Sequence, residues 1–266
     1  MADITEADLE SLRVSLLPLM GVQLPILSIP KDVLAAFEPS QVGTIVGTLM
    51  DACIPHLDII MPEQDLLKKI GLSRAPGVLK DREGYPDYLH NSGRRLELKL
   101  LYVDPGDGLL KATETPREPS ARITQKVTIK NVEPAKDALL VVAYQLKPTK
   151  NKADIYSPEI LDIGVFSMIE CVRARDHRLK EGGGRWFGDY ETPVVLSKRG
   201  RMKQESGHVL DTSTYGRKED EGRDFNEDTN FGKLKRIPYM PLQAFLKKMG
   251  ANYASTGSYP QPWKLK

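Results

Sequence analysis

The sequence predicts a mixed α/β fold, in which a central β-sheet is flanked by helices and carries loop insertions. Two patterns support this prediction. Apolar residues recur at helical spacing over the first 75 residues, and after residue 84 they alternate or run together as they do in strands. A length of 266 residues with 40% hydrophobic content is enough to bury a substantial core. We therefore expect one domain over 1–266, with a helical part (1–75), a sheet-forming part (80–146) and a region of insertions (171–236).

Three helices are expected in the N-terminal part. The first covers residues 5–20, where Thr5 and Asp8 match a capping box and leucines recur every three or four positions. The second covers 40–53 and has one apolar stripe. A third, shorter helix is expected at 63–70. Their apolar stripes are typical of packing faces, although one of them would also suit a dimer interface.

The strand pattern begins with a hairpin. Residues 85–90 and 94–103 are rich in strand-forming types, and between them lies Asn91-Ser92-Gly93. Hairpin loops of three residues commonly place glycine at the last position, where the backbone is left-handed. Pairing across this loop predicts that Asp87 lies directly opposite Glu97.

Other segments extend the sheet and its cover. The near-continuous apolar run at 137–146 is typical of a buried central strand. Residues 160–172 predict a further strand or a buried helix, and 119–132 fit either helix or strand. A short helix is expected at 241–249, and 206–232 has the composition of a long polar loop.

The composition favours a cytoplasmic protein without a membrane partner. No run approaches 18 apolar residues, and the acidic N-terminus lacks the pattern of a signal peptide. Cys53 and Cys171 have no CxxC neighbours, so neither a disulfide framework nor a thiolate zinc site is indicated. The four histidines lack the HxxxH and HExxH spacings of a zinc site, and no GK[ST] follows the glycines at 182–184. Residues 224–230 resemble a calcium loop but lack its sixth-position glycine and twelfth-position glutamate.

The hairpin gathers charged side chains on one face. Strand side chains alternate, so Glu97 and Lys99 share a face with Asp87. The opposite face is apolar and is expected to pack on the core; its residues are Leu96, Leu98 and Leu100. The hairpin therefore presents two carboxylates and one ammonium on the same side.

A divalent cation would explain this arrangement. Directly opposed side chains have Cβ atoms about 4.5–5.5 Å apart, so Asp87 and Glu97 repel unless a cation or proton lies between them. Mg²⁺ accepts one or two carboxylates and keeps waters for chemistry, and Lys99 would lie beside it. A simpler interpretation stays open: an exposed hairpin in which Arg94, Arg95 and Lys99 neutralise the two carboxylates.

Pro86-Asp87 followed by Glu97-Leu98-Lys99 resembles the motif of the PD-(D/E)XK nuclease superfamily, whose best-populated members are type II restriction endonucleases. The resemblance covers roughly residues 84–146 and implies a restriction-endonuclease-like core. It implies that Asp87 and Glu97 bind Mg²⁺ with help from the Leu98 carbonyl, and that Lys99 assists the hydroxide that attacks phosphorus. Some branches add a glutamate from a preceding helix, for which Glu63 is the candidate, and others a later glutamine, here Gln125.

Charge is distributed in blocks that suit a polyanionic partner. Net charge is only +2, but residues 171–204 hold nine Lys/Arg against four Asp/Glu, and 233–266 hold seven basic residues and no acidic one. Solvated surface is the plainer explanation of such blocks. The basic residues expected to contact DNA are Arg185, Lys198, Arg199, Arg201, Lys203, Arg173 and Arg175.

These features predict a Mg²⁺-dependent endonuclease that cuts double-stranded DNA at specific sites as a homodimer, like a type II restriction enzyme. The dimer follows from two-strand cutting, since one site per chain cuts one strand. Two alternatives remain: a repair or recombination nuclease on structured DNA, and a non-catalytic nucleic-acid-binding module.

Overall fold

The protein is a mixed α/β fold, as the sequence predicts. The computed structural model describes residues 3–77, 84–112, 121–124, 127–150, 152–181 and 232–250. Contacts divide the chain into two compact units. The first unit is Met1–Ala121, Pro134–Met168 and Ala244–Tyr259; the second is Arg122–Glu133, Ile169–Gln243 and Pro260–Lys266. The single domain with insertions at 171–236 stays a prediction.

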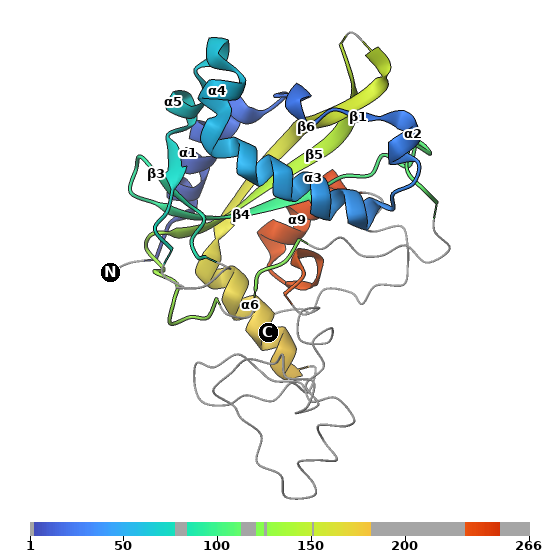
Figure 1. Cartoon of the computed structure of the whole chain (residues 1–266). Helices are drawn as coiled ribbons and strands as arrows, with labels where there is room; N and C mark the ends of the chain where they lie inside the picture. Colours follow the sequence, from blue (N-terminus) through green and yellow to red (C-terminus); the bar gives the residue numbers. More distant parts are fainter. Residues whose placement is uncertain are drawn as a thin grey trace, which may run out of the picture. The chain divides into compact units, whose positions relative to one another are not determined.

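One mixed sheet dominates the first unit (Figure 1). Within the described residues it has six strands in the order β1-β6-β5-β4-β3-β2. They are β1 (Ile29–Pro30), β2 (Leu72–Arg74), β3 (Tyr88–His90), β4 (Arg95–Tyr102), β5 (Asp137–Thr149) and β6 (Lys152–Ser167). β4 and β5 are parallel, and every other neighbouring pair is antiparallel.

The three predicted N-terminal helices are present, with shifted ends. α1 (Glu6–Leu16) begins at the expected capping box of Thr5 and Asp8, and α3 (Pro39–Cys53) ends before a 3₁₀ turn. The third is split into a 3₁₀ turn (Pro62–Gln64) and α5 (Leu66–Ile70). Further helices are α2 (Lys31–Leu34), α4 (Leu57–Ile60), α6 (Met168–Glu181) and α9 (Met240–Met249), the last matching the helix expected at 241–249.

α3 lies across β4 and buries one stripe of its surface (Figure 1). A side-chain carbon added at Gly43 or Gly47 would lie 3.6 Å from the Cβ atoms of Tyr102 and Leu100 respectively, so the helix backbone approaches the strand closely. The leucines of α1, the stripe of α3 and the even-numbered residues of β4 and β5 form one apolar core. The stripe predicted for the first helix therefore serves packing, whereas in the stripe predicted at 40–53 Val42 and Val46 are buried but Ile45 and Leu49 are exposed.

One stretch of this cover is also apolar enough to be a candidate membrane span. The segment Pro39–Ile60 is long and apolar enough to cross a membrane, judged by its length and composition alone, and has a mean hydropathy of 1.2. This differs from the expectation of no such run, because the uncharged outer face of α3 adds Ile45 and Leu49 to its buried stripe. In this structure the stretch is α3, a 3₁₀ turn and α4, and its inner stripe packs on the sheet.

β5 is the buried central strand that the sequence predicts. All residues from Asp137 to Leu146 are buried, and β5 lies between β4 and β6. The two alternatives for residues 160–172 both occur, since β6 runs to Ser167 and α6 begins at Met168. The described residues within 119–132 form neither a helix nor a regular strand: Arg122 makes an isolated bridge with Lys233, and residues 129–131 form a turn.

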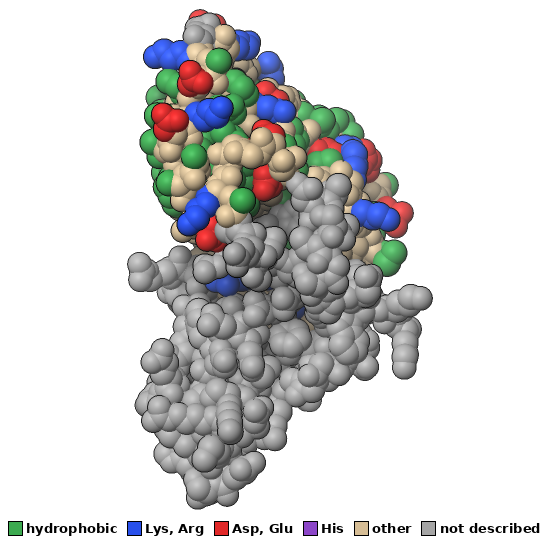
Figure 2. All heavy atoms as spheres, turned by 90° about the vertical axis from the view of Figure 1, so that its right-hand side faces the viewer, with side chains coloured by type: hydrophobic (Ala, Val, Ile, Leu, Met, Phe, Trp, Pro, Cys, Tyr) green, Lys and Arg blue, Asp and Glu red, His purple; other side chains and the backbone are tan. Residues whose placement is uncertain are grey.

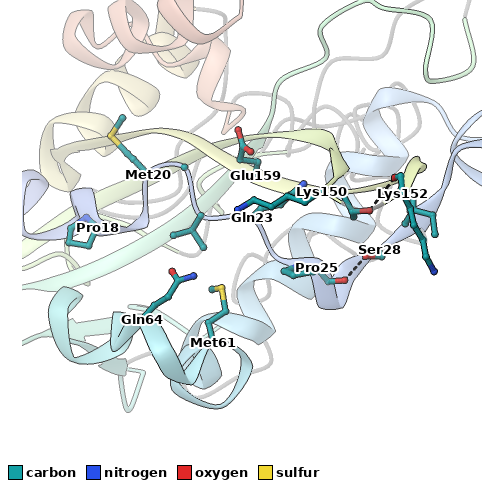
Figure 3. A pocket seen from close by; sticks show the side chains of 14 residues that line it. Pro18, Met20, Gln23, Pro25, Ser28, Met61, Gln64, Lys150, Lys152 and Glu159 are labelled. Atoms are coloured by element: carbon teal, nitrogen blue, oxygen red, sulfur yellow. Dashed lines mark hydrogen bonds between the residues drawn. The ribbon is translucent and has the colours of Figure 1, made fainter.

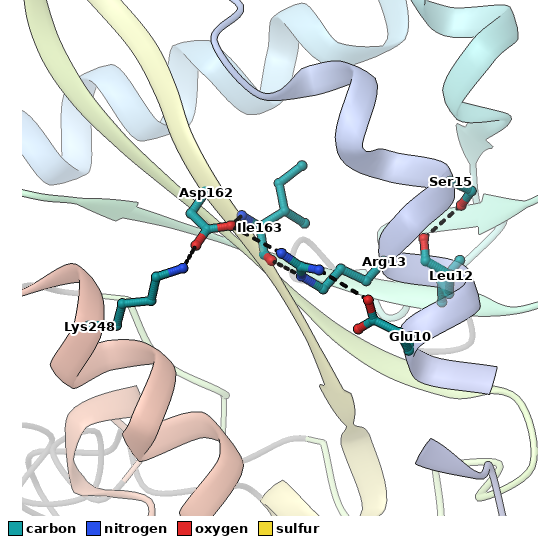
Figure 4. A network of polar contacts seen from close by, with 7 residues as sticks. All are labelled: Glu10, Leu12, Arg13, Ser15, Asp162, Ile163 and Lys248. Atoms are coloured by element: carbon teal, nitrogen blue, oxygen red, sulfur yellow. Dashed lines mark hydrogen bonds and ion pairs between the residues drawn. The ribbon is translucent and has the colours of Figure 1, made fainter. Parts of the chain in front are cut away.

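A register shift in β6 accommodates a buried acid. Ala143 pairs with Asp162 but Tyr144 pairs with Ile160, so one extra residue enters β6. Figure 4 shows the carboxylate of Asp162 between Lys248 of α9, at 2.7 Å, and Arg13 of α1, at 3.6 Å. Burial raises the pKa of Asp162. The hydrogen bonds that it accepts from Lys248 and from the Ile163 N–H lower the pKa by more, so the net shift is downward. Three elements of the first unit are thus tied together by one carboxylate.

In the second unit, a buried arginine plays a structural part. Arg175 is only 2% exposed, and its guanidinium donates to the carbonyls of Thr124 and Val127 at 2.8 Å each. It also pairs with Asp176. These contacts correct the expectation that Arg175 reaches DNA, because its donors are already used within the fold.

Candidate active site

The predicted hairpin forms with the predicted register. The N–H of His90 donates to the carbonyl of Arg94 at 2.9 Å, and Tyr88 pairs with Leu96. Gly93 has a φ of +80°, the left-handed conformation expected at the end of a three-residue loop. The tip of the hairpin is held by α1, since Arg94 pairs with Asp8 at 2.8 Å.

Asp87 lies one residue beyond the end of the β3 ladder. Its N–H donates to the carbonyl of Leu96 at 3.0 Å, and its own carbonyl accepts from the N–H of Ala75. Its side chain turns to β4, where Oδ2 accepts a hydrogen bond from the Leu98 N–H at 2.7 Å. The carboxylate is therefore fixed against β4 by the strand backbone.

Glu97 and Lys99 stand on the same face of β4, as predicted. Lys99 Nζ donates to Glu97 Oε1 at 2.7 Å. The prediction pictured these side chains as displayed on an open face, but Glu97 is only 3% exposed and the Lys99 side chain 18%. The apolar face is as predicted, with Leu96 and Leu98 buried in the core and Leu100 next to α3.

The two carboxyl groups interact strongly. Burial and the charge of Asp87 raise the pKa of Glu97 to about 7, against the opposing effect of Lys99. Burial also raises the pKa of Asp87, although Lys99 and the Leu98 N–H act in the opposite direction. Burial lowers the pKa of Lys99, but the neighbouring carboxylates outweigh it and the net shift is upward. Lys99 therefore stays an ammonium at neutral pH.

One carboxylate oxygen of this pair has no donor. Oε2 of Glu97 is buried and has no hydrogen-bond partner among the residues that the structure describes. The charge of Asp87 acts on this carboxyl group, and two ionised carboxylates have no proton to share. A buried acceptor of this kind normally has a partner, so this oxygen marks a place for a proton or a cation.

A backbone carbonyl also faces this place. In an extended strand, the N–H and C=O of one residue point to the same side. Because the Leu98 N–H points to Asp87, the Leu98 carbonyl lies on the same edge of β4. The ligands that the resemblance implies, Asp87, Glu97 and the Leu98 carbonyl, are thus neighbours in the structure.

The alternative interpretation was an exposed hairpin whose two carboxylates are neutralised by Arg94, Arg95 and Lys99. In the structure, two of these three cations bind other groups. Arg94 pairs with Asp8 and donates to the carbonyl of Ala135, and Arg95 forms two hydrogen bonds with Asp137 at 2.5 and 2.6 Å. Of these three cations, Lys99 forms an ion pair with Glu97, at 2.7 Å. Two carboxylates then share one ammonium.

Tyrosines lie on both sides of Asp87 in the chain. The hydroxyl of Tyr85 donates to Asp137 Oδ2 at 2.5 Å, and that of Tyr88 donates to Asp51 Oδ1 at 2.7 Å. Each aspartate also binds an arginine: Asp137 binds Arg95, and Asp51 binds Arg74 at 3.2 Å.

Asp51 is a charged neighbour of the site that the sequence analysis missed. It lies near the end of α3, and its charge raises the pKa of both Asp87 and Lys99. Glu63, the candidate helix acid, is exposed in the 3₁₀ turn Pro62–Gln64 instead. Asp51 is the one charged residue of α3, on an otherwise uncharged helix that leads to the hairpin, and that signal was available in the sequence.

The remaining predicted residues are only partly described. Arg173 is on α6, is exposed and pairs with Glu170. Gln125 and the five basic residues between 185 and 203 lie outside the described residues. On the face drawn in Figure 2, basic and acidic side chains of the described residues are interspersed, so no single charge dominates there. The expected DNA-contacting surface therefore stays a prediction.

A cavity of about 770 Å³ lies elsewhere in the first unit (Figure 3). Its walls are the 18–28 segment, the Met61–Gln64 turn and the tip of the β5–β6 hairpin with Lys150 and Lys152. The amide of Gln23 is already used, since it donates to the carbonyls of Lys147 and Pro148. The cavity contains no pair of carboxylates and does not include the hairpin residues.

The carboxylate pair is smaller than a typical protein-only metal centre. Among the described residues, no group of three or more His, Cys, Asp or Glu side chains is arranged to hold a metal ion. Mg²⁺ sites built from one or two carboxylates and water do not need a third. Comparisons with protein-family models, curated proteins and solved structures found no match.

Proposed function

We propose that the protein is a Mg²⁺-dependent endonuclease that hydrolyses phosphodiester bonds of double-stranded DNA, with a restriction-endonuclease-like core. Asp87, Glu97 and the Leu98 carbonyl would hold the ion, and Lys99 would act beside it. The observation that carries this proposal is the buried, donor-free Oε2 of Glu97 next to the carboxylate of Asp87.

A bound cation would explain why Asp87 and Glu97 lie side by side away from solvent. Removing a carboxylate from water costs several kcal/mol unless charge partners replace the solvent. Here Lys99 supplies one positive charge for two carboxylates, and a divalent cation would neutralise the remainder. The oxygen ligands present are those that Mg²⁺ prefers. A role in stability alone would be better served by apolar residues or by a second ammonium.

The chain's own groups fit phosphodiester hydrolysis. Mg²⁺, when bound, lowers the pKa of a coordinated water and polarises a phosphoryl oxygen. Lys99 is an ammonium held by Glu97, at the partly exposed edge of the site. From there it would hold the attacking water or stabilise charge that develops on the phosphate. Asp87, fixed by the Leu98 N–H, would keep its second oxygen for the ion.

The partner and the mode of cutting rest on further argument. Site-specific cutting of both strands calls for two sites, so we propose a homodimer as for a type II restriction enzyme. Basic residues in 171–204 and 233–266 would contact the phosphates. The exposed Arg173 supports that placement, whereas the buried Arg175 does not.

The test is cleavage of plasmid and linear DNA by the full chain with and without Mg²⁺. Discrete fragments support a restriction enzyme, branch-dependent nicking supports a repair or recombination nuclease, and binding without cleavage supports the non-catalytic module. Glu97→Gln should abolish cutting. Glu6→Gln is the matched control, because it removes the same charge from an exposed position on α1, and it should cut like the parent.

A further inference from the structure

Asp87 is bracketed by two three-residue clusters of the same composition. In the first, Tyr85 donates to Asp137, and Arg95 binds the same aspartate. In the second cluster, Tyr88 donates to Asp51, and Arg74 binds that aspartate. In both, the arginine also stands over the tyrosine ring, at 5.9 Å in the first and 4.5 Å in the second.

The clusters tie the Asp87 segment to different parts of the first unit. Asp137 is the first residue of β5 and is 1% exposed, whereas Asp51 belongs to α3. Tyr85 and Tyr88 are buried, at 1% and 0% exposed. Burial first, and the adjacent aspartate second, raise the pKa of each tyrosine, so both hydroxyls remain donors at neutral pH.

Asp87 needs such anchoring because local structure does not supply it. It lies outside the β3 ladder, and the nearby carboxylate of Glu97 repels it. A free segment would relieve this repulsion by turning the Asp87 side chain toward water. The hydrogen bond from the Leu98 N–H opposes that movement only while the backbone of residues 85–88 is held in place.

Both clusters anchor the Asp87 segment without adding net charge near it. Each contains one aspartate and one arginine, so the two charges of the cluster balance, although Arg74 still lowers the pKa of Asp87. An arginine that was not paired in this way would compete for the carboxylates of Asp87 and Glu97 and displace a cation from them. Paired arginines therefore add no net positive charge around the carboxylate pair.

We propose that Tyr85 and Tyr88 are positioning residues, which hold Asp87 against β4 through the Asp137–Arg95 and Asp51–Arg74 pairs. This inference rests on the proposed function where it concerns metal binding, and on the fold alone where it concerns the place of Asp87. Outer groups that orient metal ligands commonly contribute about 10- to 100-fold to metal affinity. We expect Tyr85→Phe and Tyr88→Phe each to weaken Mn²⁺ binding roughly tenfold and to lower kcat, with DNA affinity unchanged.

The experiment uses two readouts on the full chain. Calorimetric titration with Mn²⁺ compares the parent with Tyr85→Phe, Tyr88→Phe and Asp87→Asn. Amide hydrogen exchange of Leu98, in metal-free protein, reports directly on whether Asp87 stays in place. Tyr144→Phe is the matched control, since Tyr144 is another buried tyrosine of the sheet whose hydroxyl meets the Val42 carbonyl instead.

The outcomes separate the two proposals. Faster exchange of Leu98 in both tyrosine variants, but not in Tyr144→Phe, supports positioning whether or not Mn²⁺ binds. Exchange equal to that of Tyr144→Phe overturns it. If the parent neither binds Mn²⁺ nor cuts DNA while the exchange result holds, the proposed function fails and the positioning role stands. If Asp87→Asn loses Mn²⁺ but the tyrosine variants bind it like the parent, the effect on metal binding is refuted.

Discussion

The carboxylate of Asp87 accepts a hydrogen bond from the backbone N–H of Leu98 at 2.7 Å, across the two strands of the hairpin. This contact brings Asp87 beside Glu97 on the polar face of β4. The pair then has two buried or half-buried carboxylates and one ammonium, Lys99.

Lys99→Gln should lower kcat for DNA cleavage by about 100- to 1000-fold, because removing one positive group beside a developing oxyanion has effects of this size. DNA affinity, measured in Ca²⁺, should stay at the parental value. Lys68→Gln is the control, since Lys68 is 83% exposed on α5 and has no proposed role in the site. Parental kcat in Lys99→Gln would exclude Lys99 from the chemistry.

Glu97→Gln should stabilise the metal-free protein while it abolishes cleavage. The change removes a buried negative charge whose Oε2 has no donor. The free energy of unfolding at pH 8 in a chelator should rise by on the order of 1–3 kcal/mol. Urea titrations of Glu97→Gln and of the exposed Glu63→Gln measure it. A less stable Glu97→Gln protein would mean that the charge of Glu97 is compensated in the metal-free state.

The stability of the metal-free protein should fall as pH rises toward neutrality. The folded pKa of Glu97 is about 7, above its ordinary value of 4.5, so the folded state holds a proton that the unfolded state has released. The stabilising contribution is complete below pH 4.5 and is lost as pH rises through 7. Mg²⁺ should cancel this loss, because it replaces the proton. Melting temperatures at several pH values, with chelator and with Mg²⁺, test this; parallel curves would contradict it.

His90 should make the hairpin turn sensitive to acid, in the opposite direction. Its Nδ1 accepts from the Ser92 N–H at 3.1 Å, and Nε2 lies 3.1 Å from Ser15 Oγ on α1. Burial lowers its pKa from 6.5, so its stabilising contribution is present above 6.5 and is lost as pH falls through the lower, folded pKa.

The acid effect of His90 is best measured where Glu97 no longer titrates. In a Glu97→Gln background, the urea concentration at the unfolding midpoint should decrease as the pH is lowered from 7.5 to 5.5. Adding His90→Gln should remove most of that fall. An unchanged pH dependence would show that the ring is not held by the turn.

Arg175→Leu should destabilise the protein and leave phosphate contacts intact. It removes the donor of two buried carbonyls, each of which costs about 1–3 kcal/mol when left without a partner. The salt dependence of DNA binding should not change. Arg173→Gln, on the exposed side of the same helix, should leave the stability unchanged and reduce the salt dependence of DNA binding. Loss of salt dependence in Arg175→Leu would restore Arg175 as a DNA contact.

Much of the fold was predictable because it depends on local patterns. The capping box of Thr5 and Asp8, the loop ending at Gly93 and the apolar run of β5 are each specified by neighbouring residues. The segment 160–172 was ambiguous, because an apolar run buries equally well as strand or helix, and it contains both. The described residues within 119–132, which are mostly irregular, lacked any local pattern that would have indicated their conformation.

By itself, the sequence determined which side chains share a face. Alternation along β4 and a three-residue loop are short-range properties, and they were enough to bring Asp87, Glu97 and Lys99 together. Only the tertiary structure decided what surrounds them: that Arg94 and Arg95 are paired elsewhere, that Glu97 is buried, and that Asp51 approaches from α3. Such partners come from elements distant along the chain. Their proximity follows from packing, which no local spacing encodes.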